Sequence, residues 1–438
     1  MNRTVEKNRT LLVDGPASVV TTSGKVEVFG LRMNNTQRIV IREGKRLPFA
    51  VEEKATFDIS LAQKANVEEV EGNTIPPSWN EASEELSTLQ NKPITAMVVG
   101  TVDSGKTSLC TFLVNKLLQQ KKKVAVLDGD IGQSDIGPPC TVAYTFLAKP
   151  TTDLFNLQAK NAVFIGVTSP NGAADKTIAG LTSLKEEIMK ENPDLIIVNS
   201  DGWIEGDEAV KYKIQLAQRI NPDVIFFIQQ REELAPAVNA LGKFRKVLVV
   251  SPPLINQRSR EKRKNLRELG YIKYLRNAKV QSYPLGWLKI EDSELFGLTK
   301  ARANTKEASR IYSLLGMKPL HFTEQSDRIS IIIGKRRWIS TENLKRLEEN
   351  TKKKVVVIRK GEEEGSLMAL YNTERKFLGI GLLQEIEYLR RTIKILTPVS
   401  ENIAIAAIGK IRLDKNMKEM SAFGEEGQPE FPAFNKLS

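Results

Sequence analysis

The sequence is poor in the residues that build zinc sites and disulfide frameworks. Its 438 residues include one histidine, His321, and two cysteines, Cys110 and Cys140. A zinc site of the usual Cys/His type is therefore not expected. Histidine acid–base chemistry would depend on His321 alone, and we expect that residue to lie on a surface or in a linker. Two distant cysteines favour a reducing compartment.

Long apolar runs are also missing. No run approaches the ~18 residues that a membrane-spanning helix needs, and residues 1–6 contain no apolar signal core. A hydrophobic content of 41% with 27% charged residues is ordinary for a globular protein, and we expect a cytoplasmic location, or a nuclear one in a eukaryote. The formal net charge of +12 favours polyanionic partners such as RNA or DNA, a basic but solvated surface being the alternative.

The chain is long enough for two or three domains. Short β-like runs separated by glycine turns predict a small all-β, sandwich-like domain over residues 1–75. Residues 72–78 contain Pro76-Pro77 and are predicted to be a linker. A central domain is expected over residues 76–285, and a β-rich domain over residues 286–438.

The stretch from Gly100 to Thr107 has the form G-x-x-x-x-G-K-[ST], which is the phosphate-binding loop. Its two glycines let backbone N–H groups point at phosphate oxygens, Lys106 reaches the β- and γ-phosphates, and Thr107 ligates Mg²⁺. The helix that follows directs its positive end at the anion. The predicted nucleotide-binding residues are Gly100, Thr101, Val102, Asp103, Ser104, Gly105, Lys106, Thr107 and Ser108.

From residue 93 to about residue 270, apolar strands alternate with amphipathic helices. This alternation predicts an α/β domain with a doubly wound parallel sheet of the P-loop NTPase type, whose site lies at the carboxyl ends of the strands. The predicted strands are Ala96–Val99, Val124–Asp128, Ala162–Val167, Leu195–Asn199, Val224–Ile228 and Val247–Val250.

Two carboxylates, Asp128 and Asp130, stand one residue apart where the second predicted strand ends, and Gln133 follows them. Metal-assisted phosphoryl transfer needs one group that organises Mg²⁺ and another that accepts a proton from the attacking hydroxyl. An ordinary solvated turn is the alternative.

The loop at 100–107 together with this Asp-x-Asp-x-Gly-Gln sequence resembles the polynucleotide 5′-hydroxyl kinases. These enzymes phosphorylate RNA ends and include the kinase subunit of the eukaryotic pre-mRNA cleavage machinery. Partitioning and metallochaperone ATPases also carry an aspartate after the second strand, but they usually bear a second lysine early in the loop. Thr101-Val102 does not supply that lysine here.

The resemblance implies a nucleic-acid site built from two further stretches. One resembles the clasp that grips the RNA end and contains Thr168, Ser169, Pro170, Asn171 and Gly172. The other contains Gly202-Trp203, whose indole in the family stacks on the terminal base; a plain turn and a core tryptophan are the respective alternatives. Family members often have Asp-Thr where this chain has Asn199-Ser200, so Asp201 is considered as a substitute.

The densest positive charge lies near residues 258–269, where Arg263 and Arg267 share a helix face and Arg258 precedes them. The family has a lid helix with this spacing, which closes over the triphosphate, whereas a solvated basic face is the alternative. Three other basic runs, residues 121–123, 335–337 and 352–354, are interpreted as solvated, with RNA contact as the minor alternative.

The resemblance therefore implies an RNA 5′-hydroxyl kinase that uses ATP or another NTP, with DNA left open as an acceptor. It implies that Thr107 and Asp128 hold Mg²⁺ and that Asp130 is the base. Lys106, Arg263, Arg267 and Arg258 complete the catalytic set, and Gln133 assists at the nucleic-acid site. A silent scaffold of an RNA-processing complex and a nucleotide-switched ATPase are the competing hypotheses.

Overall fold

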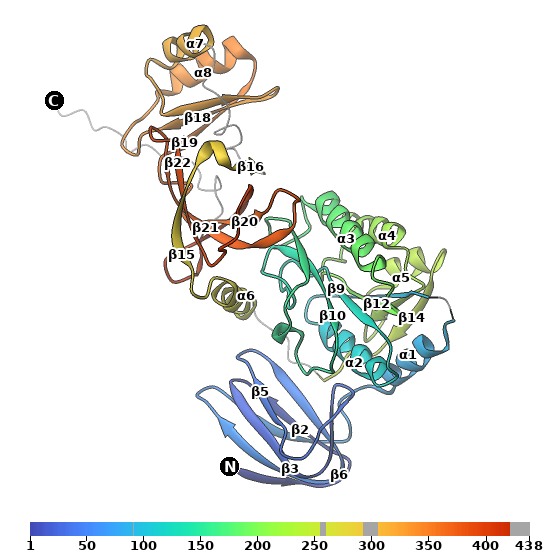
Figure 1. Cartoon of the computed structure of the whole chain (residues 1–438). Helices are drawn as coiled ribbons and strands as arrows, with labels where there is room; N and C mark the ends of the chain where they lie inside the picture. Colours follow the sequence, from blue (N-terminus) through green and yellow to red (C-terminus); the bar gives the residue numbers. More distant parts are fainter. Residues whose placement is uncertain (91, 255–259, 292–304, 421–438) are drawn as a thin grey trace, which may run out of the picture. The chain divides into compact units, whose positions relative to one another are not determined.

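The computed structural model describes residues 1–90, 92–254, 260–291 and 305–420 (Figure 1). Residues 1–270 form one compact unit, and a second unit begins at Tyr271. No helix among these residues is both long enough and apolar enough to cross a membrane.

The first seven strands form one antiparallel sheet. They are β1 (Asn2–Val5), β2 (Arg9–Asp14), β3 (Ala17–Val28), β4 (Leu31–Arg32), β5 (Arg38–Ile41), β6 (Arg46–Leu61) and β7 (Val67–Glu71). The long strand β6 pairs with β2 through its first half and with β1 through its second. Phe49 and Phe57, both fully buried on β6, pack edge to face with ring centroids 5.9 Å apart. The predicted sandwich-like domain is thus one hydrogen-bonded sheet around an aromatic core.

A second seven-stranded sheet has the order β11-β10-β9-β12-β8-β13-β14. Its elements are β8 (Ile94–Gly100), α2 (Lys106–Leu118), β9 (Val124–Asp128), β10 (Thr141–Leu147), β11 (Asn161–Phe164), α3 (Ala174–Met189), β12 (Leu195–Asn199), α4 (Asp207–Ile220), β13 (Val224–Ile228), α5 (Ala235–Gly242) and β14 (Lys246–Val250). Helix α1 (Pro77–Thr88) precedes the sheet, a short 3-10 turn (Leu154–Asn156) follows β10, and α6 (Arg260–Tyr274) follows the sheet. Helices α3, α4 and α5 pack on one face and α1 and α2 on the other (Figure 1).

The sheet departs from the predicted all-parallel arrangement at one strand. β10 runs antiparallel to both β9 and β11, and the sequence interpretation contained no strand over 141–147. Only twelve residues separate Asp128 from Thr141, and none of them forms a helix that could carry the chain across the sheet, so the chain returns antiparallel. These twelve residues remain at the carboxyl edge of the sheet, where they carry Asp130.

The second unit contains two sheets. The larger has the order β15-β22-β21-β20-β23-β16, with β24 paired to β23, and the smaller has the order β17-β18-β19. Their elements are β15 (Lys279–Pro284), a 3-10 turn (Leu285–Trp287), β16 (Lys289–Glu291), α7 (Thr305–Leu315), β17 (His321–Glu324), β18 (Arg328–Ile333), α8 (Thr341–Thr351), β19 (Lys354–Arg359), β20 (Ser366–Tyr371), β21 (Phe377–Glu387), β22 (Thr392–Thr397), β23 (Ile405–Leu413) and β24 (Glu419–Met420). Because β15 pairs with β22, residues 279–284 belong to this unit and not to the central domain in which the sequence placed them.

Candidate active site

The phosphate-binding loop connects β8, which is buried throughout, to α2. Gly105 caps α2 with φ 100°, a left-handed conformation that glycine adopts without strain. No side chain caps the first turn of α2, so its amide groups are available to an anion. A Cβ on Gly100 would lie 2.5 Å from Oγ of Ser104, which explains why the loop needs glycine there. This geometry fits a bound phosphate.

Lys106 is folded over the loop and is 5% exposed. Its Nζ donates to the carbonyl oxygen of Thr101 at 2.7 Å. Burial lowers the pKa of Lys106, and the negative charge of Asp130 opposes that shift. The buried hydroxyl of Ser104 has no hydrogen-bond partner in the part of the chain that the structure describes. The ammonium group has three N–H donors and donates one to Thr101, so it can also donate to a phosphate oxygen.

Asp128 lies beneath the loop and is fully buried at the end of β9. Nδ2 of Asn199 donates to Oδ1 of Asp128 at 3.0 Å and lies 3.4 Å from Oγ1 of Thr107. Oδ2 of Asp128 accepts bonds from the Ser134 hydroxyl and from the amide groups of Asp135 and Ile136. Burial, with the charges of Asp135 and Asp130, raises the pKa of Asp128 to about 7. Of the two predicted metal ligands, Thr107 lines the cavity and Asp128 lies behind it.

Asp130 lies in the loop between β9 and β10 and lines the same cavity. Its Oδ1 accepts the amide N–H groups of Gly132 at 3.2 Å and Gln133 at 3.0 Å, which fixes the carboxylate. Burial raises the pKa of Asp130, and Lys106 opposes that shift. A positioned carboxylate with a raised pKa is suited to accept a proton.

The loop after β12 is held by a buried ion pair. Nζ of Lys213, which is fully buried on α4, lies 2.9 Å from Oδ2 of Asp201. The same carboxylate accepts the Tyr212 hydroxyl at 2.8 Å and the Trp203 amide at 2.9 Å. Asp201 is therefore fully engaged in holding its own loop, and Asn199 is the residue that contacts Thr107 and Asp128.

Trp203 is half-buried, stacks on Tyr212 with ring centroids 5.4 Å apart, and also lines the cavity. The clasp contributes Thr168, Ser169 and Pro170 to the cavity wall, whereas Asn171 and Gly172 do not reach it. The clasp packs closely on the Asp130 loop, because a Cβ on Gly132 would lie 2.7 Å from the carbonyl oxygen of Thr168.

The predicted lid arginines lie on α6. Nη1 of Arg263 forms an ion pair with Oδ2 of Asp103 at 3.1 Å, and Arg267 also lines the cavity. Helix α6 is seated tightly, since a Cβ on Gly270 would lie 2.7 Å from Pro139. Arg258 lies outside the described residues.

Two cations from the N-terminal sheet also line the cavity, and sequence reasoning missed both. Arg42 bonds Asp135 and Asp153, each at 2.6 Å, and its guanidinium lies 4.3 Å from the Phe155 ring centroid. Lys45 approaches Asp153 at 3.6 Å. Burial alone would raise the pKa of Asp153, but Lys45 and Arg42 outweigh it and lower the pKa to about 2. The sequence signal here is Glu43-Gly44-Lys45, a turn pattern that does not indicate which cavity its side chains line.

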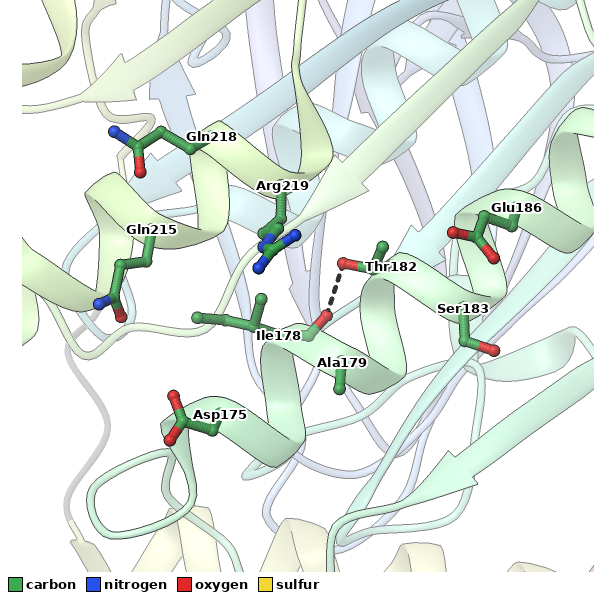
Figure 2. A pocket seen from close by; sticks show the side chains of 9 residues that line it. All are labelled: Asp175, Ile178, Ala179, Thr182, Ser183, Glu186, Gln215, Gln218 and Arg219. Carbon is green, nitrogen blue, oxygen red and sulfur yellow. Dashed lines mark hydrogen bonds between the residues drawn. The ribbon is translucent and has the colours of Figure 1, made fainter.

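Cavity size alone does not identify the site. The cavity around the phosphate loop has a volume of about 670 Å³, and a groove between α3 and α4 has about 690 Å³ (Figure 2). The groove shares no residue with the cavity, and its Thr182 hydroxyl is bonded to the Ile178 carbonyl at 2.8 Å. Of these two sites, only the cavity around the phosphate loop is lined by that loop together with the Asp130 carboxylate and the arginines of α6.

Residues 100–277 match the family model described as the P-loop of mRNA cleavage and polyadenylation factor CLP1. The chain is 30% identical over 335 residues to a polyribonucleotide 5′-hydroxyl-kinase of Methanocaldococcus jannaschii, covering 75% of this chain and 90% of the relative. A polyribonucleotide 5′-hydroxyl-kinase of Pyrococcus abyssi is 27% identical over 356 residues, covering 81% of this chain and 97% of the relative.

The fold is also that of a solved structure, the wild-type Clp1p–Pcf11p (454–563) complex. The TM-score is 0.66 at 14% identity, and the match covers 94% of this chain and 97% of that chain. The phosphate loop, the sheet around it and the similarity to these relatives all point to one family. The chain belongs to the polyribonucleotide 5′-hydroxyl-kinase family.

Proposed function

We propose that this protein transfers the γ-phosphate of ATP, or of another NTP, to the 5′-hydroxyl end of RNA. The observation that carries the proposal is the convergence of the phosphate loop, the fixed carboxylate of Asp130 and the arginines of α6 on one cavity. Its volume of about 670 Å³ lies within the range of small-molecule sites. Family membership supplies the acceptor class.

The residues divide into a group that binds the donor and a group that acts on the acceptor. Lys106 and the loop amides would hold the phosphates, and Thr107 would ligate Mg²⁺, with Asn199 linking the Thr107 hydroxyl to Asp128. A bound Mg²⁺ would neutralise the charge that develops on the transferred phosphoryl group. Asp130 accepts the proton of the 5′-hydroxyl as that oxygen attacks the γ-phosphorus in line, and the bond from this phosphorus to the β,γ-bridging oxygen breaks, so that the nucleoside diphosphate leaves.

The arginines and the tryptophan position the reactants. Arg263 and Arg267 neutralise charge on the transferred phosphoryl group, a contribution that reaches about 10³-fold in other phosphoryl-transfer enzymes. Arg263 must then leave Asp103, its partner in this structure. Trp203, already stacked on Tyr212 on one side, offers its exposed surface to the terminal base, and the clasp offers hydroxyls and amides to the backbone.

A product assay tests the proposal. The protein is incubated with γ-labelled ATP and Mg²⁺ and with matched RNA or DNA oligonucleotides that carry a 5′-hydroxyl or a 5′-phosphate. Label should appear on the 5′-hydroxyl RNA and not on the 5′-phosphate control, and Lys106→Ala should abolish it. Hydrolysis of ATP without labelled nucleic acid would contradict the proposal and favour a nucleotide-switched ATPase.

A further inference from the structure

The loop between β18 and α8, residues 334–340, has a composition unlike that of a simple connection; we call it the Trp338 loop. Lys335, Arg336 and Arg337 are exposed and are followed by Trp338, which is 61% exposed. A hydrogen bond from the Arg337 amide to the Gly334 carbonyl oxygen, 2.9 Å long, closes a turn in the loop. Four consecutive side chains are thus presented to solvent, one of them the largest apolar side chain in proteins.

The indole is held in place from below. Strands β18 and β19 are parallel and pair Ile333 with Arg359, so Arg359 emerges at the edge of the sheet where the loop begins. Its guanidinium lies 4.1 Å from the Trp338 ring centroid. Glu362 fixes Arg359 in turn, accepting its amide at 3.0 Å and its Nη1 at 3.2 Å. One face of the indole therefore rests on a cation, and the rest of the ring is open to a planar ligand.

The charge around the ring is strongly positive. Within the described part of the chain, Lys335, Arg336 and Arg337 form no ion pair. Glu362 is paired with Arg359, and Glu342 lies in the first turn of α8. Three unpaired cations beside an exposed aromatic ring match a ligand with flat rings and a repeating negative charge.

We infer that the Trp338 loop is a second contact for single-stranded RNA, separate from the cavity in which the 5′ end reacts. This inference rests on the proposed function, which makes RNA the substrate. Trp338 stacks on an unpaired base, and Lys335, Arg336 and Arg337 neutralise the adjoining phosphates. A duplex does not expose base faces to such a ring, so the contact selects unpaired RNA.

The test uses the full chain, no nucleotide, and a labelled unstructured 30-nucleotide RNA with a 5′-phosphate. Trp338→Ala should weaken binding about 5- to 150-fold, and Trp338→Phe, which keeps a ring, should restore most of it. The triple variant Lys335→Gln/Arg336→Gln/Arg337→Gln should reduce the slope of log K against log salt by about 2, for three phosphates on a single strand.

The same unit offers a matched control. Lys345 and Arg346 on α8 and Lys354 at the start of β19 are exposed cations outside the loop. Their triple replacement by Gln removes equal charge and should leave the salt slope within about 0.5 of the parent. An equal loss in both triple variants would show a non-specific charge effect and overturn the inference.

Chain length separates this inference from the kinase proposal. With a 5′-hydroxyl trinucleotide, Trp338→Ala should leave kcat and KM unchanged, whereas KM for the 30-nucleotide RNA should rise about as much as Kd. If the parent transfers no phosphate, the kinase proposal fails while the binding measurement still decides the loop. If neither Trp338→Ala nor the loop triple changes RNA affinity, RNA is excluded and an acidic protein becomes the ligand to examine.

Discussion

The loops that carry Trp203 and Trp338 use the same side chain under opposite conditions. Trp203 is half-buried, and its loop is held by the ion pair of Lys213 and Asp201, whose side chains are 0% and 4% exposed. Trp338 is 61% exposed and rests on Arg359, a partly exposed cation. The Trp203 loop is therefore held by a buried ion pair, whereas Trp338 rests on a partly exposed cation and keeps most of its surface open to a ligand.

The largest effect is expected where the buried support is broken. Lys213→Met should lower the free energy of unfolding by about 3 kcal/mol or more, because Asp201 is left as an uncompensated buried charge. Chemical denaturation measures this. Arg359→Gln, which removes the corresponding support of Trp338, should cost less than about 1 kcal/mol. Equal losses would remove the contrast between the two loops.

The next largest effect is expected for Asp130→Asn. The amide preserves the shape of the side chain but cannot accept the proton, so kcat should fall at least about 100-fold in the labelled-phosphate assay. ATP binding, followed by calorimetry, should change little, and binding of the 30-nucleotide RNA at the Trp338 loop should not change. A variant with full rate would show that another group is the base.

Trp203→Ala should weaken RNA binding by about 1–3 kcal/mol, through the loss of one stacked base, and ATP binding far less. In contrast to Trp338→Ala, this loss should appear with a trinucleotide as well as with the 30-nucleotide RNA. Losses of equal size for ATP and RNA would identify Trp203 as a structural residue.

The smallest effect concerns pH in the unit that carries the Trp338 loop. His321 is half-buried on β17, and its Nε2 has no hydrogen-bond partner among the described residues. Burial, with the charge of Arg391, lowers the pKa of His321 from 6.5 to about 4. Between these values the unfolded chain binds the proton more tightly, so stability falls as pH falls from 6.5 toward 4.

At pH 5 this contribution is about 1–2 kcal/mol relative to pH 7. His321→Leu should remove it, so that thermal unfolding of the variant depends less on pH than that of the parent. Identical pH profiles for the two proteins would show that His321 is accessible to protons in the native state. We expected His321 on a surface or in a linker; it lies instead in β17, where it is half-buried.

Local sequence patterns predicted the strands of the central sheet well where both the spacing of apolar residues and the length of the apolar run were informative. Val124–Asp128, Leu195–Asn199 and Val224–Ile228 are strands with the predicted bounds. They are continuous apolar runs buried on both faces, which is the strongest strand signal. Thr141–Leu147 was missed because it follows a loop and not a helix, and nothing local fixes its direction.

The candidate site was predictable only where its residues lie within one motif. The phosphate loop, Asp130 and Trp203 stand at strand ends, so topology alone brings them together. Arg42 and Lys45 reach the cavity from another sheet, and no spacing reports such a contact. Lys213 did leave a signal, because it falls within the apolar stripe of α4, where the other buried residues are Ala209, Tyr212, Leu216, Ala217 and Ile220.

The turn that carries Arg42 and Lys45 bears on whether the central domain can work without the N-terminal sheet. Arg42 neutralises Asp135 and Asp153, which belong to the central sheet's own loops. A central domain produced without residues 1–75 of the chain would keep both carboxylates and lose their counter-ions, so the cavity would be less favourable to a triphosphate. The turn of the N-terminal sheet therefore forms part of the wall of the site. A chimaera made from two relatives has to take the N-terminal sheet and the central domain from the same protein.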